Sequence, residues 1–358
     1  MSRLIRAIID TQALRHNLNV IRARAGRARV IAVVKANAYG HGLVSAALAI
    51  QDAGAFAVAR LEEGMSLRAA GITARVILLE GVFSRSQLED AAQDQLDLVI
   101  HDTRQIELLE QTGGAARFAL WIKIDTGMNR LGFAPRDFPA ALKRIRMLRS
   151  APRELRLMTH LACADERDGE VTRAQLERFA AACEGLRLET SVVNSAGLLC
   201  GAAPDSHWVR PGLALYGASP FEDSTAADFG LQPVMTLVSS VLTVREVSKG
   251  ERVGYGGAWT APRAARVAII AAGYGDGVHR SFAPGTPVLI RKQRAPLVGR
   301  VSMDMIAVDV TGIAGIDVGT PAILWGEGLP VEEVARHAGT IPYELLCSVS
   351  QRVPLEPR

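Results

Sequence analysis

The chain has few cysteines, little excess charge and no long apolar run, and each of these shortages excludes a class of protein. Its four cysteines form no C-x-x-C pair and lie at no short spacing from a histidine pair, so we expect neither a metal site nor a disulfide framework. Lys and Arg number 41 against 37 Asp and Glu, and the net charge of +4 is too small to indicate a nucleic-acid partner. No run approaches the roughly 18 apolar residues of a membrane span. Arg6 interrupts the apolar start, which predicts no signal peptide. We therefore expect a soluble, cytoplasmic protein without a membrane partner.

The composition that is present is typical of a globular protein. Hydrophobic residues make up 49% of the 358 positions and charged residues 22%, which excludes disordered and fibrous classes. At roughly 100–200 residues per domain, the length predicts two domains. A chain of this size buries most of the surface that its unfolded form exposes, so it needs no disulfides for stability.

From Thr11 to about residue 228, short apolar runs alternate with stretches of helical spacing. The runs are rich in Val, Ile and Leu, as buried parallel strands are. Eight strands are predicted, at Val30–Val34, Ala55–Ala59, Arg75–Leu79, Leu96–Ile100, Phe118–Ile124, Leu155–Leu161, Ser191–Asn194 and Gly212–Leu215. The predicted helices include Thr11–Arg24, Leu43–Ala53, Leu61–Ala70, Thr103–Gln111, Pro135–Arg149 and Val171–Cys183. This α/β pattern predicts a (β/α)8 barrel like the TIM barrel, because the competing doubly wound sheet usually has fewer strands.

The rest of the chain has a different sequence pattern. Short β-rich runs separated by Gly/Pro turns follow one another from residue 229 to the end, with one helical pattern at Val331–Ala338. The opening run Ile5–Ile9 has no evident barrel partner and is expected to pair with these later strands. The sequence thus predicts a barrel domain at residues 10–228 and a mostly-β domain at 229–358. The N-terminal strand within residues 1–9 is expected to be part of the mostly-β domain.

Lysine is scarce, at 5 residues against 36 arginines, and two lysines stand where a charge is unwelcome. Lys35 ends the apolar run V-I-A-V-V-K, and Lys123 lies inside F-A-L-W-I-K-I-D. A charged ammonium on a barrel strand is costly unless it is paired or used. Lys35 is either a lysine whose amine reaches water at a strand end or a desolvated amine suited to Schiff-base chemistry. Catalytic groups of barrel enzymes lie at the C-terminal ends of the strands, which favours the second interpretation.

The residues around Lys35 resemble the cofactor-binding motif of the alanine racemase family. Eight further segments resemble that family in the same order along nearly the whole chain. The nine segments are V-V-K-A-N-A-Y-G-H-G, I-D-T-G-M-N-R-L-G-F, T-H-L-A-C-A-D-E, V-N-S-A-G, V-R-P-G-L-A-L-Y-G, V-G-Y-G-G-A-W, G-Y-G-D-G, G-R-V-S-M-D-M and I-P-Y-E-L-L-C-S-V-S-Q-R-V-P.

The resemblance implies a racemase that depends on pyridoxal 5′-phosphate and interconverts L-alanine and D-alanine. Lys35 matches the lysine that holds the cofactor and serves as the base for the D-enantiomer. Tyr255 matches the base for the L-enantiomer, although without the motif it would more often be an aromatic residue of a glycine turn. Racemisation needs a proton removed from one face of the α-carbon and another delivered to the opposite face, so two bases are expected.

Further matches imply how the cofactor is held. Arg210 matches an arginine that faces the pyridine nitrogen; since it keeps its proton, that nitrogen stays unprotonated and the ring is a weaker electron sink. His160 matches a histidine near this arginine, but alone it would more often be a satisfied core histidine. The positions that match the family's phosphate contacts are Tyr39, Ser195, Gly212, Leu213 and Tyr343.

The resemblance also assigns the substrate contacts. Arg130 and the backbone of Met303 match groups that hold the substrate carboxylate, and Tyr274 and Tyr343 match the tyrosines that narrow the entrance. Lys123 matches a lysine that is carbamylated in many members, which would place an anion beside Arg130. An ordinary ion pair of Lys123 with Asp125 or Asp304 is the alternative.

One departure and several alternatives accompany these expectations. Some family members have a histidine three residues before the asparagine of N-S-A, where this chain has Ser191, so a longer hydrogen-bond relay behind Arg210 is in doubt. A racemase of another small amino acid such as serine, and a barrel protein of pyridoxal-phosphate homeostasis, are the alternatives. Barrel proteins of pyridoxal-phosphate homeostasis lack a β-rich C-terminal domain, which this chain is predicted to have. The family implies a homodimer with shared active sites, and either cell-wall supply or alanine catabolism as its role.

Overall fold

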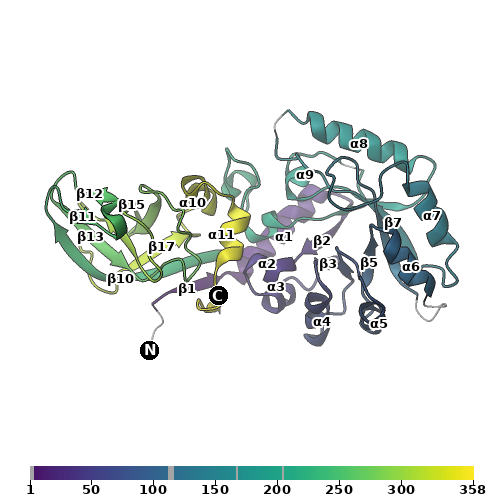
Figure 1. Cartoon of the computed structure of the whole chain (residues 1–358), viewed down its shortest axis with the longest axis horizontal. Helices are drawn as coiled ribbons and strands as arrows, with labels where there is room; N and C mark the ends of the chain where they lie inside the picture. The colour runs from purple at the N-terminus through teal and green to yellow at the C-terminus, as the bar shows by residue number, and fades with distance from the viewer. Residues whose placement is uncertain (1–3, 112–116, 167, 204) are drawn as a thin grey trace. The chain divides into compact units, whose positions relative to one another are not determined.

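The structure, a computed structural model, describes residues 4–111, 117–166, 168–203 and 205–358. The chain divides into two compact units (Figure 1). The barrel unit comprises Asn17–Ala38 and Gly42–Leu215, and the β unit comprises the chain through His16, Tyr39–His41 and Tyr216–Arg358. Within the described ranges, no helix combines the length and the apolar character that crossing a bilayer requires.

The barrel unit contains a closed sheet of eight parallel strands, as the sequence predicts. Its core residues are almost all apolar and buried, because helices cover the outer face while the inner face fills the barrel. The last strand pairs with the first at Val30 and Val209, which closes the barrel. The strands are β2 Arg29–Val33, β3 Ala55–Val58, β4 Val76–Leu78, β5 Asp97–Ile100, β6 Ala119–Lys123, β7 Glu154–Met158, β8 Glu189–Ser191 and β9 Trp208–Val209.

The helices between these strands follow the predicted order. They are α3 Leu43–Ala49, α4 Leu61–Ala69, α5 Arg85–Gln93, α6 Thr103–Gln111, α7 Phe138–Arg146, α8 Glu170–Cys183 and the short α9 Ser195–Leu199, preceded in the chain by α1 Thr11–Ala25. Helix α5 is not among the predicted helices.

The prediction of the eighth strand at Gly212–Leu215 is wrong. The strand is Trp208–Val209, and Leu213–Tyr216 forms a single 3-10 turn (η1) that is buried as deeply as a strand. A short apolar run does not distinguish a buried turn from a buried strand, so the pattern misled here. The seventh strand likewise ends at Ser191, where the prediction had it begin.

The β unit is built around one long strand, β10 Met235–Val247. It pairs with β13 Ala265–Ile270, with β17 Pro321–Trp325 and with the N-terminal strand β1 Arg6–Ile9. The other strands of this sheet are β14 Pro287–Ile290, β15 Gln293–Val298, β16 Ile306–Asp309 and β18 Leu355–Pro357, and β11 Arg252–Val253 pairs with β12 Trp259–Thr260 separately. The unit also contains helices α10 Val331–Ala338 and α11 Pro342–Ser348 and the short turns η2 Ala226–Phe229 and η3 Tyr255–Gly257. It is mostly β, as predicted.

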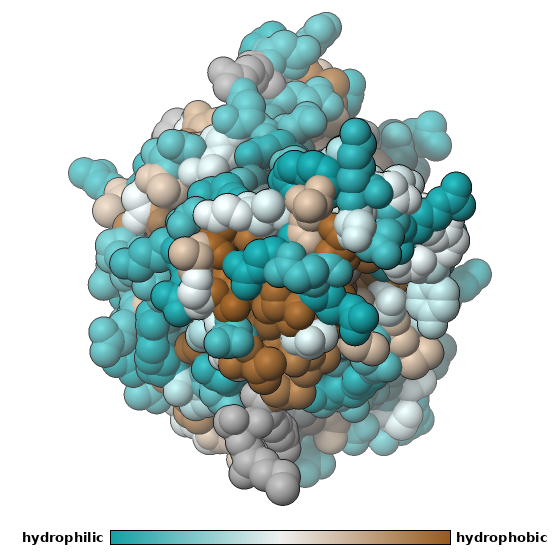
Figure 2. All heavy atoms as spheres, turned by 90° about the vertical axis from the view of Figure 1, so that its left-hand side faces the viewer, coloured by the Kyte–Doolittle hydropathy of each residue, from teal (hydrophilic) through white to brown (hydrophobic). Residues whose placement is uncertain are grey.

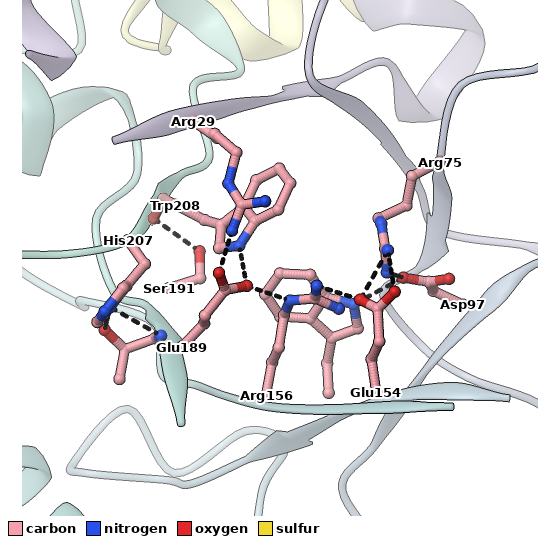
Figure 3. A network of polar contacts seen from close by, with 11 residues as sticks. Arg29, Arg75, Asp97, Glu154, Arg156, Glu189, Ser191, His207 and Trp208 are labelled. Carbon is pink, nitrogen blue, oxygen red and sulfur yellow. Dashed lines mark hydrogen bonds and ion pairs between the residues drawn. The ribbon is translucent and has the colours of Figure 1, made fainter. Parts of the chain in front are cut away.

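An ionic network closes the N-terminal end of the barrel (Figure 3). Arg156 of β7 contacts both Glu154 and Glu189, with 2.6 Å from its Nε to Glu189 Oε2, and its guanidinium lies over the rings of Trp121 and Trp208. The indole of Trp208 also donates to Glu189 at 3.0 Å. The network continues through further pairs, Arg29 with Glu189, Arg75 with Glu154, and Arg75 with Asp97. Charges at this end of a barrel serve stability rather than chemistry.

Glu189→Gln should lower the free energy of unfolding at pH 7 by about 1–2 kcal/mol, because Arg156 is buried and loses a charged acceptor. Desolvation raises the pKa of Glu189, but hydrogen bonds from Trp208 and Arg156 and the charge of Arg156 outweigh it and lower the pKa to about 2 from 4.5. A lowered pKa stabilises the fold above pH 4.5, and this contribution disappears as the pH falls toward 2.

Urea denaturation should therefore show a gap between the natural protein and Glu189→Gln that narrows from pH 5 toward pH 2.5. Burial raises the pKa of Asp97, but Asp97 is common to both proteins and cancels in this comparison. Glu62→Gln, at an exposed position of α4, is the control. A gap that stays constant over this range would contradict the assignment.

Candidate active site

Lys35 stands at the start of a left-handed turn at the C-terminal end of β2. The three residues after it have positive φ and ψ: Ala36 (54°, 52°), Asn37 (54°, 43°) and Ala38 (55°, 49°). Each such L-residue costs roughly 1–2 kcal/mol, so the surroundings must impose the turn. The carboxylate of Glu63 accepts from the backbone N–H of Ala36 at 2.6 Å, and the Asn37 side chain accepts from that of Leu43 at 2.8 Å. Sequence reasoning missed both Glu63 and Asn37.

Three other predicted site residues of the barrel unit also lie at or just after the C-terminal end of a strand. Lys123 is the last residue of β6, His160 lies two residues after β7, and Arg210 directly follows β9. Because the strands are parallel, all of these positions are at the C-terminal end of the barrel. The structure therefore brings together lysines and an arginine that are far apart in the sequence.

Arg210 is a buried cation that is held by neutral acceptors. Its guanidinium donates to the hydroxyl of Ser191 at 2.7 Å and to the backbone oxygens of Thr159 at 2.5 Å and Val192 at 3.2 Å. Burial lowers its pKa to about 10, still far above neutrality, so it keeps its charge. No carboxylate pairs with it among the described residues. Ser191, noted in the sequence only as a departure from the family, is thus a direct partner of this arginine.

His160 is the fourth group around Arg210. Its Nδ1 lies 3.2 Å from an Arg210 nitrogen, which donates, so Nδ1 is the acceptor and the ring is neutral. Burial lowers the pKa of His160 well below its ordinary value, and the positive charges of Arg210, Lys123, Arg130 and Lys35 lower it further. The neutral ring is therefore stable at physiological pH.

Lys123 is buried and close to the same cations. Burial lowers its pKa to about 8, with the charges of Arg210 and Arg130 next in importance and Asp125 opposing them. Asp125 forms no ion pair with Lys123 in the part of the chain that the structure describes. Its carboxylate instead accepts backbone N–H groups of Gly127, Asn129 and Arg130 at 2.9–3.1 Å. About a tenth of Lys123 is thus an uncharged, nucleophilic amine at pH 7.

Arg130 lies in the exposed loop after β6. It lines a cavity of about 390 Å3 between the loops that follow β4, β5 and β6. Arg104 and His101 also line this cavity. An exposed guanidinium on a cavity wall can hold a carboxylate in two-point geometry.

A hydroxyl and a buried turn meet where the chain leaves β8 and β9. They belong to Ser195, Gly212 and Leu213. The Ser195 hydroxyl accepts from the backbone N–H of Gly212 at 2.9 Å and from that of Ala214 at 3.2 Å. Leu213 begins the buried η1 turn between them. A hydroxyl among backbone N–H groups is suited to a phosphate, provided that it turns to donate to the ligand.

The remaining predicted residues belong to the β unit. Tyr39 is buried, with its ring 4.9 Å from that of Tyr216 and 6.0 Å from that of Tyr343. Burial, and then the proximity of Tyr343 and Cys347, raises the pKa of Tyr39, so its phenol stays protonated and can donate a hydrogen bond. Gly40 cannot be replaced easily here, because a Cβ would come within 2.2 Å of the Leu346 oxygen.

Tyr255, Tyr274 and Met303 are exposed, with 66%, 43% and 52% of their surface accessible. Tyr255 stands between Gly254 and Gly256, both with positive φ. Backbone hydrogen bonds join the other two loops, from Tyr274 to the Ser302 oxygen at 3.0 Å and from Gly275 to the Met303 oxygen at 2.9 Å. Large apolar side chains that are this exposed on glycine-rich loops are typical of contact surfaces.

Comparisons with known proteins agree over both units. The chain matches the family model for the alanine racemase N-terminal domain at residues 9–220 and that for the alanine racemase C-terminal domain at 234–356. It is 46% identical to the alanine racemase of Vibrio parahaemolyticus over 351 residues, which cover 98% of each chain. It is 48% identical to that of Nitrosomonas eutropha over 357 residues, 99% of each. Its structure is similar to the crystal structure of biosynthetic alanine racemase from Pseudomonas aeruginosa, with a TM-score of 0.96, 45% identity and full coverage of both chains. It is also similar to the alanine racemase from Acinetobacter baumannii, with a TM-score of 0.92, 38% identity and full coverage.

Competitive acetylation with mass-spectrometric readout should show that Lys123 titrates near pH 8 in carbonate-free buffer, with about half of the amine uncharged at that pH. Arg130→Gln should raise the pKa of Lys123, because it removes a neighbouring positive charge. Arg136→Gln, which removes an exposed arginine of the same loop region, is the matched control, and the exposed Lys143 is the internal reference. If Lys123 titrated together with Lys143, the described environment would be wrong.

Proposed function

The chain belongs to the alanine racemase family and is an amino-acid racemase, and from this premise we propose that it interconverts L-alanine and D-alanine with pyridoxal 5′-phosphate bound to Lys35. The observation that carries the proposal is the cluster of cations at the C-terminal end of the barrel. Lys35, Lys123, Arg130 and Arg210 are close enough to depress the pKa of His160 together. Such a cluster is stable when anions enter it, and a phosphate and a substrate carboxylate are anions of that kind.

The residues present fit the cofactor. Ser195, Gly212 and Leu213 offer a hydroxyl and backbone N–H groups for the phosphate, and the protonated phenol of Tyr39 is a further donor, with Tyr343 beside it. Arg210 keeps its proton and is fixed by neutral partners, so it can face a pyridine nitrogen only as a donor. When bound, pyridoxal 5′-phosphate delocalises the electron pair left behind when the α-proton is removed.

Two bases on opposite faces complete the reaction. The Lys35 amine, fixed by its strained turn, takes the α-proton of D-alanine or returns a proton to that face. Tyr255 does the same on the other face for L-alanine. Arg130 and the backbone of Met303 hold the substrate carboxylate, which fixes the direction of the α-hydrogen. Tyr274 and Tyr343 limit the entrance to a side chain as small as a methyl group.

Lys123 supports Arg130 as a carbamate. The ammonium first loses one proton to solvent, and the uncharged amine then adds to carbon dioxide and releases a second proton. The net result is an anion in place of a cation beside Arg130. The lowered pKa of Lys123 favours this reaction, since only the uncharged amine reacts. The carbamate would then hold the Arg130 guanidinium in place by a charge-assisted contact.

We propose that the active unit is a homodimer in which the β-rich domain at 229–358 of one chain covers the barrel at 10–228 of the other. The exposure of Tyr255, Tyr274 and Met303 in the single chain supports this arrangement. Two-fold symmetry would complete two sites with one kind of interface. The proposed location is the cytoplasm, and the proposed role is D-alanine supply for the cell wall or alanine catabolism.

Tyr255→Phe should reduce racemisation at least ~100-fold, the usual contribution of a general base. In deuterated solvent it should impair α-proton exchange from L-alanine while exchange from D-alanine persists. Borohydride reduction followed by peptide mapping should still place the pyridoxyl group on Lys35. Equal loss of exchange from both enantiomers would argue against separate bases, and label on Lys249 or another lysine would exclude Lys35.

Mixing inactive Lys35→Ala and Tyr255→Phe proteins should recover activity if each site is shared. With random exchange of equal amounts, half of the dimers are mixed and each has one intact site, so recovery should approach about a quarter of the natural activity. Subunit exchange is verified independently with differently tagged chains. No recovery despite proven exchange would mean that both bases come from one chain.

A further inference from the structure

A hollow of about 560 Å3 lies on the β unit and contains none of the residues assigned above to cofactor or substrate. Its floor is apolar: Leu289 of β14 and Ile323 of β17 are register partners in the sheet, and Val318 and Pro321 extend the same surface. Val318 is 70% exposed, which is unusual for a side chain of its kind. Figure 2 shows the side of Figure 1 on which β10, β13 and β15 are labelled, with apolar surface framed and crossed by hydrophilic side chains.

Two cations form the rim of this hollow, at the turn between β14 and β15. Ile290 pairs with Gln293, so Arg291 and Lys292 are a two-residue hairpin loop. Both have positive φ, 49° and 63°, as the tightest hairpin turn requires. Asn-Gly or Asp-Gly would fill these positions with little strain, whereas long side chains occupy them at a cost.

Neither cation has an anionic partner in the described part of the chain. The Arg291 guanidinium instead lies against Gly315, 3.3 Å from where a Cβ would stand. Among the residues that line the hollow, the described ones include no carboxylate. A pair of positive charges beside an exposed apolar floor is complementary to a ligand that has one negative end and an apolar chain.

We propose that this hollow binds a medium-chain fatty acid anion, with its carboxylate on Arg291 and Lys292 and its acyl chain over Leu289, Ile323 and Val318. The hollow is open to solvent, so an acyl chain on its floor would be only partly removed from water. An inorganic anion would leave the apolar floor unused. An anionic membrane surface is a poorer match, because stable adsorption takes clusters of about four to eight basic residues.

Calorimetric titration of the purified holoenzyme with octanoate should show saturable binding of one ligand per subunit at this hollow. Octanoate should bind about sixteenfold more tightly than butanoate, because each methylene half removed from water contributes about a twofold gain in affinity. Octylammonium, which has the opposite charge, should not compete. Since carboxylates can also enter the cation cluster of the barrel unit, a diazirine-bearing octanoate with peptide mapping identifies the site, and its label is expected within residues 318–323.

Two variants test the cationic rim and the apolar floor of the hollow, and a third is a control for general effects of substitution. The double variant Arg291→Gln, Lys292→Gln should weaken octanoate binding at least tenfold through loss of charge. Val318→Asp, at an exposed position that folding tolerates, should do the same through repulsion. Lys249→Gln, in the exposed turn after β10, is the matched control and should change affinity less than twofold.

Racemase activity is measured in parallel and should persist in all three proteins. Photolabel confined to barrel peptides, or octanoate affinity unchanged in both Val318→Asp and the double variant, would overturn the proposal. Equal affinities for butanoate and octanoate would also overturn it, because the floor would then have no role.

Discussion

Buried positive charge that no described carboxylate pairs with is the constraint on which the C-terminal end of the barrel depends. A buried cation is costly unless it is paired, and breaking such a pair is strongly destabilising. Among the described residues, the acceptors of Arg210 are oxygen and nitrogen atoms that carry no charge, and Lys123 lies nearby. The consequences follow in order: His160 stays neutral, Lys123 loses part of its charge, and the proposed site holds an excess of positive charge.

The two ends of the barrel accommodate buried arginine side chains in opposite ways. At the N-terminal end, arginines and carboxylates alternate in one network, and two indoles cover the central guanidinium. At the C-terminal end, no carboxylate of the described residues forms an ion pair with Arg210, and Asp125 forms none with Lys123. The closed sheet keeps these environments on opposite sides of a packed core. Because of this separation, substitutions that stabilise the first end need not disturb the second.

Sequence patterns predicted the barrel and the order of its strands because buried parallel strands leave continuous apolar runs. They also singled out Lys35 and Lys123, since a lysine inside such a run is conspicuous. They failed at the eighth strand, where the buried turn Leu213–Tyr216 has the same composition as a strand. The contacts of Glu63 with Ala36 and of Ser191 with Arg210 could not be predicted, because they join residues 27 and 19 positions apart through tertiary structure alone.

The turn after Lys35 has a stereochemical consequence for the backbone itself. Ala36 and Ala38 have the torsion angles that a D-amino acid adopts without strain, since the left-handed region is the mirror image of the ordinary helical one. The methyl group of alanine is the Cβ whose contact with the backbone carbonyl causes the penalty, so each L-alanine here bears it. A protein assembled by chemical ligation with D-alanine at position 36 or 38 would relax this segment. Two L-alanines of this racemase thus hold, in its own chain, the conformation natural to the opposite enantiomer.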